Sequence, residues 1–444
     1  MKKIITLLLC AATFSAAQGQ EINDANTPLH LMQPKYSFQY AIPSEQTIKQ
    51  DIDRVLSFLE QAMPTEIADG RLKQGGFRLT SYESGVMYSA IEDAALRTGD
   101  DRYMQFSKQR LEFLADFASK VEKNFKKDPD FDKQMKPMLF PAALDDCGAM
   151  CAAYCRLSLR TGKQYDDVIN RYINRVKSQY RIGDDNIFAR TRPHTHTVWL
   201  DDMYMGIPPL AWYGALKGDA SAIQEAVEQI RAFKRRMWMP EWKLFRHGWV
   251  QEMQSHPFFP WGRANGWAIL TMCEVLDAMK QMNYNGPERE EVIQLLRQHI
   301  DGICALQDKS GLWHQLLNDP TSYLETSASA IYTYCMAHAI CEGWIDALTY
   351  GAQTLIAWQA VSTQINERGQ VMNTCVGTGM GFEPAFYCHR PVHPMAAHGY
   401  GPTIWAGSEM IRMLRMTHPK MNDSAIHFYN KEQTTNQPIF SEEQ

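Results

Sequence analysis

The fold is decided by a stretch that first occurs at residues 84–117, SGVMYSAIEDAALRTGDDRYMQFSKQRLEFLADF. Its first half is apolar and rich in small residues, and its second half, after a glycine, is amphipathic with one charged stripe. The pattern recurs with a period of about sixty residues, at 147–179, 204–237, 265–300 and 327–361. Each copy predicts a hairpin of two helices, the first buried on all sides and the second exposed along its charged stripe.

The turns of the five predicted hairpins share a glycine, at Gly99, Gly162, Gly218, Gly286 and Gly343. Glycine adopts, at little cost, the positive φ that commonly ends a helix. We therefore expect each of these glycines to mark the end of the first helix of its hairpin.

Two single helices are predicted outside the hairpins, an amphipathic one at 45–63 and an apolar one at 401–416. Paired with each other, they would form a sixth hairpin and close the repeats into a ring. An open solenoid is the alternative, but solenoids usually have shorter repeats and polar terminal units. We expect an all-α, six-hairpin (α/α)6 barrel that occupies residues 20–444 as a single domain, with a solvated loop at 121–137.

The first residues indicate export. Residues 1–19 have a basic start, an apolar core and small residues near their end, which are the features of a signal peptide. Cys10 lies too early in the apolar run for a lipoprotein signal, so we expect a periplasmic or secreted protein without a membrane anchor.

The composition excludes some classes of partner. The formal net charge is -5 and the basic residues are dispersed, which argues against nucleic acid. Nine of the ten cysteines follow residue 19, and Cys147, Cys151 and Cys155 share one face of a predicted helix. We interpret these cysteines as small buried apolar residues, because no CxxC pair is present and a large core needs no disulfide framework.

Polar and aromatic residues gather just before the buried helices. The segments are PAALDDCG at 141–148, RTRPHTHTVWLDDMYMG at 190–206, RHGWVQEMQSHPFFPWGRANGW at 246–267, GLWHQLLNDPTSYLETSASA at 311–330 and FEPAFYCHRPVHPMAAHGYG at 382–401. In a closed barrel all five segments lie at the same end. This convergence favours a carbohydrate pocket over a core.

Two pairs of carboxylates begin predicted inner helices, Asp201 with Asp202 and Asp145 with Asp146. Helix capping explains such residues when they occur alone. Here Trp199 and two histidines lie beside Asp201, which favours a catalytic site. Because neighbouring carboxylates in a partly dry pocket repel, one of them is expected to keep its proton near neutral pH and act as a general acid.

His194 and His196 have the HxH spacing of some metal sites, but no dedicated ligand motif accompanies them. We expect these two residues and His398 to bind substrate, and we expect no metal or other cofactor. The glycine-rich VGTGMGF at 376–382 lacks the strand, helix and lysine of a phosphate-binding loop.

Arg263 stands between Trp261 and Trp267 in the segment WGRANGW. At least one of the three tryptophans Trp249, Trp261 and Trp267 is expected to belong to the core. A guanidinium in an aromatic pocket is well suited to bidentate binding of a sugar carboxylate.

The motifs WLDDMYMG, HGWVQ, WGRANGW and GLWHQLLNDPTSYLETSASA resemble, in order and spacing, glycoside hydrolase family 105, the unsaturated rhamnogalacturonyl hydrolases. The likeness extends from Tyr82 to the last predicted helix, and a weaker likeness links the chain to family 88, the unsaturated glucuronyl hydrolases. Both families share a six-hairpin α/α barrel, which agrees with the repeat pattern.

The resemblance also implies roles for single residues. Asp201 falls on the family's catalytic acid/base, and either Asp145 or Asp146 falls on its second pocket aspartate. Substrate-pocket positions correspond to His247, Trp261, Arg263 and Trp267. The chain departs from the family at Ala264, where glycine is frequent, and at Tyr82, where a pocket tryptophan is expected.

The implied substrate is an oligosaccharide that ends in a 4,5-unsaturated uronic acid, and the implied reaction is hydration of its double bond. An unsaturated glucuronyl hydrolase acting on another polysaccharide is one alternative. Others are an ordinary glycosidase, a polysaccharide lyase that uses Tyr204, and a non-catalytic glycan-binding protein of the envelope. The glycan behind the uronate and the oligomeric state are left open.

Overall fold

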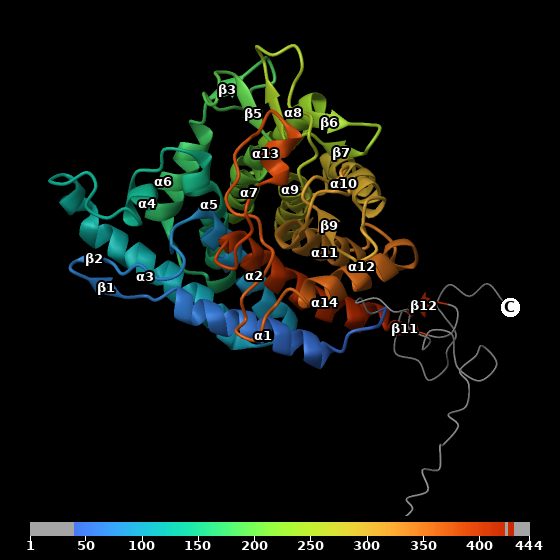
Figure 1. Ribbon diagram of the computed structural model, residues 1–444. Coiled ribbons are helices and arrows are strands. Elements are labelled where there is room, and N and C mark those ends of the chain that lie inside the picture. The colour runs from blue at the N-terminus through green and yellow to red at the C-terminus, as the bar shows by residue number, and fades with distance from the viewer. Residues whose placement is uncertain (1–39, 422–424, 430–444) are drawn as a thin grey trace, which may run out of the picture.

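The computed structural model describes residues 40–421 and 425–429, which form a closed ring of helices in two layers (Figure 1). The inner layer consists of α2 (Tyr82–Thr98), α5 (Leu144–Thr161), α7 (Asp201–Lys217), α9 (Gly262–Gln281), α11 (Thr326–Cys341) and α14 (Tyr400–Thr417). Each inner helix packs against the next, and α14 packs against α2. The predicted (α/α)6 barrel is confirmed, and the open solenoid is wrong because the first and last inner helices touch.

The outer layer consists of α1 (Glu45–Ala62), α3 (Asp101–Phe125), α6 (Asp166–Lys177), α8 (Ala220–Met237), α10 (Glu288–Cys304) and α12 (Ala347–Ser362). Every outer helix except α1 packs on the inner helix that precedes it in the chain. Helix α1 packs instead on α14. The sixth hairpin is therefore assembled from the two ends of the described chain, as the sequence predicted.

The inner helices are almost wholly buried, because each lies between two inner neighbours and beneath outer helices. In α11, every residue from Thr326 to Cys341 is buried. Small residues allow this close packing: a Cβ on Gly148 of α5 would lie 1.7 Å from the carbonyl oxygen of Met205 in α7. Glycine at 148 is thus required by the contact between two backbones.

The glycine prediction holds at four of its five positions. Gly99, Gly162 and Gly218 end α2, α5 and α7 in the left-handed conformation, and Gly343 adopts it shortly after α11. The expectation for Gly286 is wrong. Helix α9 ends at Gln281, and Asn283 takes the positive φ of 55°, because asparagine also tolerates the left-handed region.

The expected loop at 121–137 is only partly a loop. Helix α3 continues to Phe125, and the short α4 spans Met135–Leu139. Between them Asp132 is buried, and its carboxylate accepts hydrogen bonds from the backbone N–H groups of Leu72, Gln134 and Met135. A charged residue in this run therefore organises the backbone rather than facing water.

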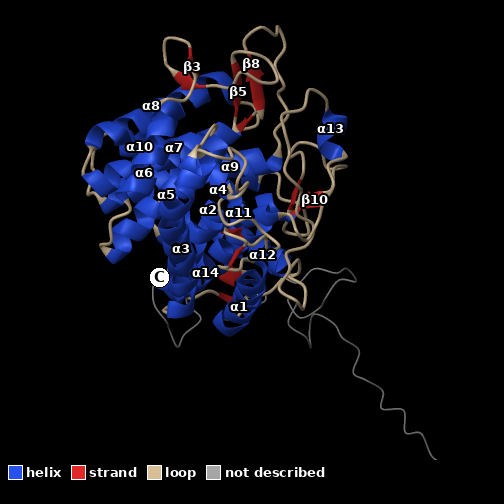
Figure 2. Cartoon of the chain, turned by 90° about the vertical axis from the view of Figure 1, so that its left-hand side faces the viewer, coloured by secondary structure: helices blue, strands red, loops and turns tan. Residues whose placement is uncertain are grey.

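Short strands, which the sequence did not predict, pair two by two around the ring (Figure 2). They are β1 (Ile67–Ala68), β2 (Arg71–Leu72), β3 (Arg181–Ile182), β4 (Ile187–Phe188), β5 (Thr197–Trp199), β6 (Trp238–Met239), β7 (Leu244–Phe245), β8 (Gly248–Val250), β9 (Trp313–His314), β10 (Leu324–Glu325), β11 (Lys420–Met421) and β12 (Ile426–His427). The pairing of β5 with β8 joins the segment before α7 to the segment before α9, with Trp199 opposite Gly248.

The predicted leader at residues 1–19 lies outside the described residues. Among the described residues, the nine cysteines are free thiols, and Cys147, Cys151 and Cys155 are buried in α5. No helix of the described chain has the length and apolar character needed to cross a membrane.

Candidate active site

The N-terminal ends of the inner helices converge on a cluster centred on Asp201. This residue begins α7 directly after strand β5, and its Oδ2 lies 2.8 Å from Nε2 of His247, which precedes β8. The backbone N–H of Leu200 also donates to the carbonyl of His247, over 2.9 Å. The pairing of β5 with β8 therefore fixes both the main chains and the side chains of this pair.

His247 is completely buried and has a partner on each ring nitrogen. Nδ1 lies 2.6 Å from the hydroxyl of Tyr387 on α13 (Pro384–Cys388), opposite the Asp201 contact at Nε2. The ring centroid of Trp261 is 4.7 Å from that of His247. Both nitrogens are thus engaged within the protein, so in this arrangement the imidazole is not free to hold a substrate carboxylate.

Arg190 joins carboxylates from two neighbouring inner helices. Its guanidinium donates to both oxygens of Asp202 over 2.8 and 2.6 Å, and to both oxygens of Asp145 over 3.1 and 2.9 Å. Trp199 packs against it, with the ring centroid 4.4 Å from the guanidinium carbon. Arg190 was not among the residues predicted from the sequence, although two pairs of carboxylates at the starts of inner helices signal that a buried cation is needed.

The charges around Asp201 control its protonation. Burial by itself raises the pKa of the Asp201 carboxyl, but His247, Arg190 and Arg263 together outweigh burial, and the pKa is lowered. The raised pKa belongs instead to Asp202, because its carboxyl is completely buried. One carboxyl of the pair therefore has a raised pKa, as the sequence led us to expect, but it belongs to Asp202 and not to Asp201, because cations surround Asp201.

Asp145 and Asp146 have different environments, although both line one cavity of about 480 Å³. Asp146 accepts hydrogen bonds from the backbone N–H groups of Ala142 and Ala143, over 2.8 and 3.0 Å, and so caps α5. Asp145 is bound by the side chains of Arg190 and, at 4.0 Å, of Arg192. Asp146 thus both caps α5 and lines the cavity, although the sequence presented capping and a place in the site as alternatives.

Tyr82 and His398 form the wall of the same cavity. The Tyr82 hydroxyl lies 2.6 Å from Nε2 of His398, although the residues are 316 positions apart in the chain. Glu83 lies 3.4 Å from the same nitrogen. Burial and the charge of Arg263 hold the pKa of His398 well below its usual value, so its imidazole is neutral.

Arg263 is buried, and its guanidinium holds the backbone of a neighbouring segment. It donates to the carbonyls of Cys375 and Val376 over 2.7 and 2.8 Å and lies against the ring of Trp261. Glu325, which the sequence analysis missed, accepts the N–H of Cys375 and lies 3.9 Å from Arg263. The carboxylate-binding role of Arg263 stays a prediction.

The remaining aromatic residues differ in exposure. Trp261 and Trp267 are both buried, and Trp267 stacks on Tyr204 with centroids 5.1 Å apart, which confirms that at least one tryptophan belongs to the core. Trp249 is partly exposed and stacks on His256, 5.0 Å away. Trp267 therefore packs in the core, whereas Trp249 borders solvent.

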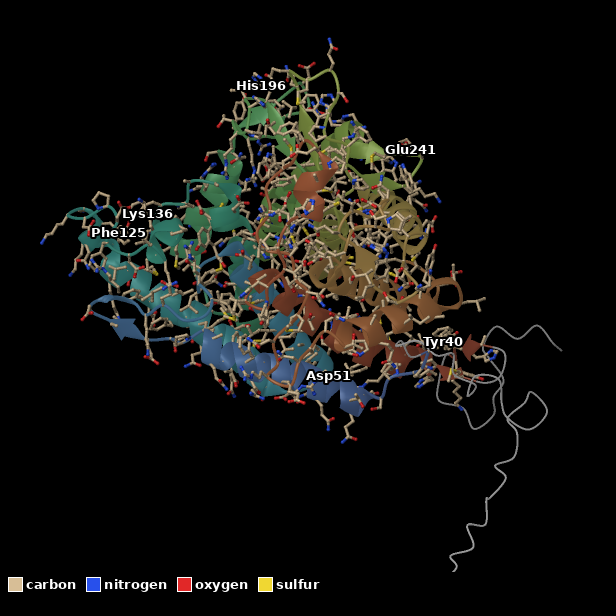
Figure 3. All side chains as sticks on the ribbon, in the orientation of Figure 1. Tyr40, Asp51, Phe125, Lys136, His196 and Glu241 are labelled. Atoms are coloured by element: carbon tan, nitrogen blue, oxygen red, sulfur yellow. The ribbon has the colours of Figure 1, made fainter. Side chains whose placement is uncertain are left out.

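His194 and His196 lie on the loop before β5, and their role in binding substrate stays a prediction. His196 is near the edge of the molecule (Figure 3), where it contacts Glu252, and the ring of His194 lies 6.1 Å from that of Phe382. In the described part of the chain, no three His, Cys, Asp or Glu side chains are placed to hold a metal ion.

Comparison with known proteins adds the family. Residues 57–414 match the model of Glycosyl Hydrolase Family 88. The chain is 29% identical over 204 residues to the unsaturated rhamnogalacturonyl hydrolase YesR of Bacillus subtilis, covering 46% of this chain and 56% of that protein. It is 24% identical over 221 residues to an unsaturated 3S-rhamnoglycuronyl hydrolase of Alteromonas sp., covering 48% and 51%. The matches thus span about half the length of these curated relatives.

A solved structure shares the fold over nearly its whole length. It is described as a possible member of the GH105 family from Salmonella enterica serovar Paratyphi A, with a TM-score of 0.68 and 22% identity. The similarity covers 88% of this chain and 99% of that one.

Proposed function

Because the chain belongs to Glycosyl Hydrolase Family 88, we propose that it is a hydrolase that releases a terminal 4,5-unsaturated uronic acid from oligosaccharides left by polysaccharide lyases. The observation that carries the proposal is the contact between Asp201 and buried His247, next to Asp202, which Arg190 joins to Asp145 in the wall of the cavity. The rhamnogalacturonyl type is our first choice, and a glucuronyl substrate from another polysaccharide is the alternative.

The reaction needs one group that can give and take a proton. Asp201 delivers a proton to C4 of the unsaturated sugar, and positive charge develops at C5 and the ring oxygen. Water then adds at C5 and returns a proton to the Asp201 carboxylate. The resulting hemiketal opens and the glycosidic bond breaks. In ordinary glycoside hydrolysis an acid must protonate the leaving oxygen, whereas this route needs no second acid for that step.

The other residues position the sugar and the water. Asp145, which is partly exposed beside Arg190, is placed to accept a hydrogen bond from a sugar hydroxyl or from the attacking water. Tyr82 and His398 offer hydroxyl and imidazole groups to the same cavity. Catalysis in this proposal comes from proton transfer at a site whose geometry is held by buried ion pairs.

The decisive experiment follows the ultraviolet absorbance of the conjugated double bond while purified protein acts on lyase-generated oligosaccharides from several polymers. We expect the absorbance to fall with wild type, and Asp201→Asn to lower kcat by about 100-fold to 10,000-fold. Asp167→Asn, an exposed change on outer helix α6, is the matched control. If unsaturated substrates stay intact while saturated glycans are cleaved, the proposal gives way to an ordinary glycosidase. Binding without turnover, unaffected by Asp201→Asn, would indicate a glycan-binding protein.

We also propose export to the periplasm or the medium, on the basis of residues 1–19 alone. Mass spectrometry of the protein recovered from cell fractions tests this. A mature N-terminus near Gln18 or Gln20 supports export, and a cytoplasmic protein that begins at Met1 contradicts it.

A further inference from the structure

Three side chains from distant parts of the sequence form a continuous hydrogen-bonded line. Asp201 begins α7, His247 precedes β8 and Tyr387 lies on α13. The two contacts are 2.8 Å from Oδ2 of Asp201 to Nε2 of His247 and 2.6 Å from Nδ1 of His247 to the hydroxyl of Tyr387. His247 and Tyr387 are both completely buried, so solvent cannot replace either partner.

The Tyr387 hydroxyl has partners for both of its functions. The N–H of Gly381 donates to it over 3.0 Å, and the carbonyl of Gly381 lies 3.4 Å away as an acceptor. When Nδ1 of His247 carries no proton, the hydroxyl donates to it. When Nδ1 carries a proton, the hydroxyl accepts from it and turns its own hydrogen to the Gly381 carbonyl. Tyr387 can therefore accompany His247 through a change of protonation without breaking the line.

We propose that Tyr387 is a positioning residue that allows His247 to hold a proton on Nδ1, and that only this protonated His247–Asp201 pair can act as the acid. The inference rests on the proposed function. It assigns the source of the proton that Asp201 transfers.

Every proton that leaves the His247–Asp201 pair returns to it within one turnover. In the active form, the pair carries one proton on Nδ1 and a second between Nε2 of His247 and Oδ2 of Asp201. The second proton moves to Oδ2, leaving a neutral imidazole protonated on Nδ1, and Asp201 transfers it to C4 of the substrate. The attacking water then returns one proton to Asp201, so the pair ends the cycle as it began.

Charged groups on the surrounding elements explain why Asp201 needs this help. Arg190 and Arg263 face Asp201 and, with His247, lower its pKa more than burial raises it. Asp202, Asp145 and Tyr82 are acidic groups nearby, and Glu383, which precedes α13, acts on Tyr387. Among these cations the Asp201 carboxyl favours its ionised form, and a buried imidazolium bonded to its Oδ2 supplies the proton directly.

The test is the pH dependence of kcat/KM for Tyr387→Phe, which removes one hydroxyl and keeps the ring. The protonated pair loses a hydrogen bond to a charged N–H, and the unprotonated pair loses only a neutral one. We therefore expect the alkaline limb of the profile to move by about one pH unit to lower pH. Tyr154→Phe is the control, because the Tyr154 hydroxyl is also buried and bonded, to the carbonyl of Leu111, far from the site.

A second measurement needs no substrate. Nitrogen NMR of histidine-labelled protein shows which nitrogens of His247 carry protons, with His247→Gln identifying the signals. We expect the doubly protonated form to persist to higher pH in wild type than in Tyr387→Phe, with Tyr154→Phe unchanged. Equal titrations in wild type and Tyr387→Phe would overturn the inference even if turnover is normal. If the titrations differ but no unsaturated substrate is consumed, the proton arrangement stands and the proposed function fails, which overturns the assignment of this proton to C4.

Discussion

Replacing Arg190 by methionine tests whether the buried ion pairs hold the site together. The change removes the cation shared by Asp145 and Asp202 but keeps a long side chain against Trp199. The two carboxylates should respond differently. Asp145 is 29% exposed and can be solvated by water, whereas Asp202 is 0% exposed and would remain as an uncompensated buried charge.

The magnitude follows from this difference. Removing one partner of a buried ion pair typically costs about 3–5 kcal/mol, and loss of a partly exposed pair costs about 1 kcal/mol or less. We therefore expect Arg190→Met to lower the free energy of unfolding by about 3–5 kcal/mol at alkaline pH, almost all of it through Asp202. The double variant Arg190→Met with Asp202→Asn should recover most of this loss, because no buried charge remains.

The pH dependence has a definite sign. Burial already raises the pKa of Asp202, and loss of Arg190 removes the strongest opposing charge and raises it further. A carboxyl with a raised folded-state pKa destabilises the protein as the pH rises above the unfolded-state value. The deficit of Arg190→Met should therefore shrink in mildly acidic solution, where Asp202 binds a proton.

Urea unfolding monitored by tryptophan fluorescence, at mildly acidic and mildly alkaline pH, measures all three quantities. The reasoning is refuted if Arg190→Met is as stable as wild type, if its deficit is independent of pH, or if Asp202→Asn does not restore stability in the double variant.

Two further positions in the inner helices, Gly148 and Glu409, test the barrel itself. Gly148→Ala should lower the free energy of unfolding by about 3 kcal/mol or more, because the new Cβ meets the Met205 carbonyl. Chemical unfolding measures this loss. Gly377→Ala is the control and should change stability little, because nothing lies within 4 Å of its Cβ. Burial raises the pKa of the Glu409 carboxyl, but the charges of Arg97 and His338 outweigh burial. The net result is a pKa lowered from 4.5 to about 2. The stability from this carboxylate is present above pH 4.5 and lost towards pH 2, so Glu409→Gln should cost on the order of 3 kcal/mol near neutral pH and progressively less on acidification. A deficit that stays constant in acid urea titrations would contradict this account.

The ring could be predicted from the sequence because the signal is local and repeated. The alternation of wholly apolar and amphipathic helices appears five times, and the pairing of 45–63 with 401–416 follows from what the repeats leave over. Gly286 shows the limit of such punctuation. A glycine near the end of a helix does not cap it when another residue, here Asn283, already takes the left-handed conformation.

The site was predicted residue by residue but not as an arrangement. Motifs identified Asp201 and His247, yet only the pairing of β5 with β8 brings them together, and these strands are too short to leave a pattern. Arg190 and Tyr387 were missed because their roles depend on contacts across 45 and 140 positions in the chain. The sign of the pKa shift at Asp201 depends on those cations, so it could not be read from adjacent carboxylates.

A second set of buried charges lies in the second halves of α2, α5 and α9, away from the helix starts that form the candidate site. There Asp93 of α2 pairs with Arg156 of α5 over 2.5 Å and accepts from the indole of Trp405 in α14 over 2.6 Å, and Arg156 also binds Glu274 of α9. These contacts tie four of the inner helices to one another. Trp212 of α7 also donates to Glu274, so the same network holds α5 and α7 side by side and keeps their starts close enough for Arg190 to bind Asp145 and Asp202 at once. The precision of the candidate active site therefore depends on residues that never touch a substrate.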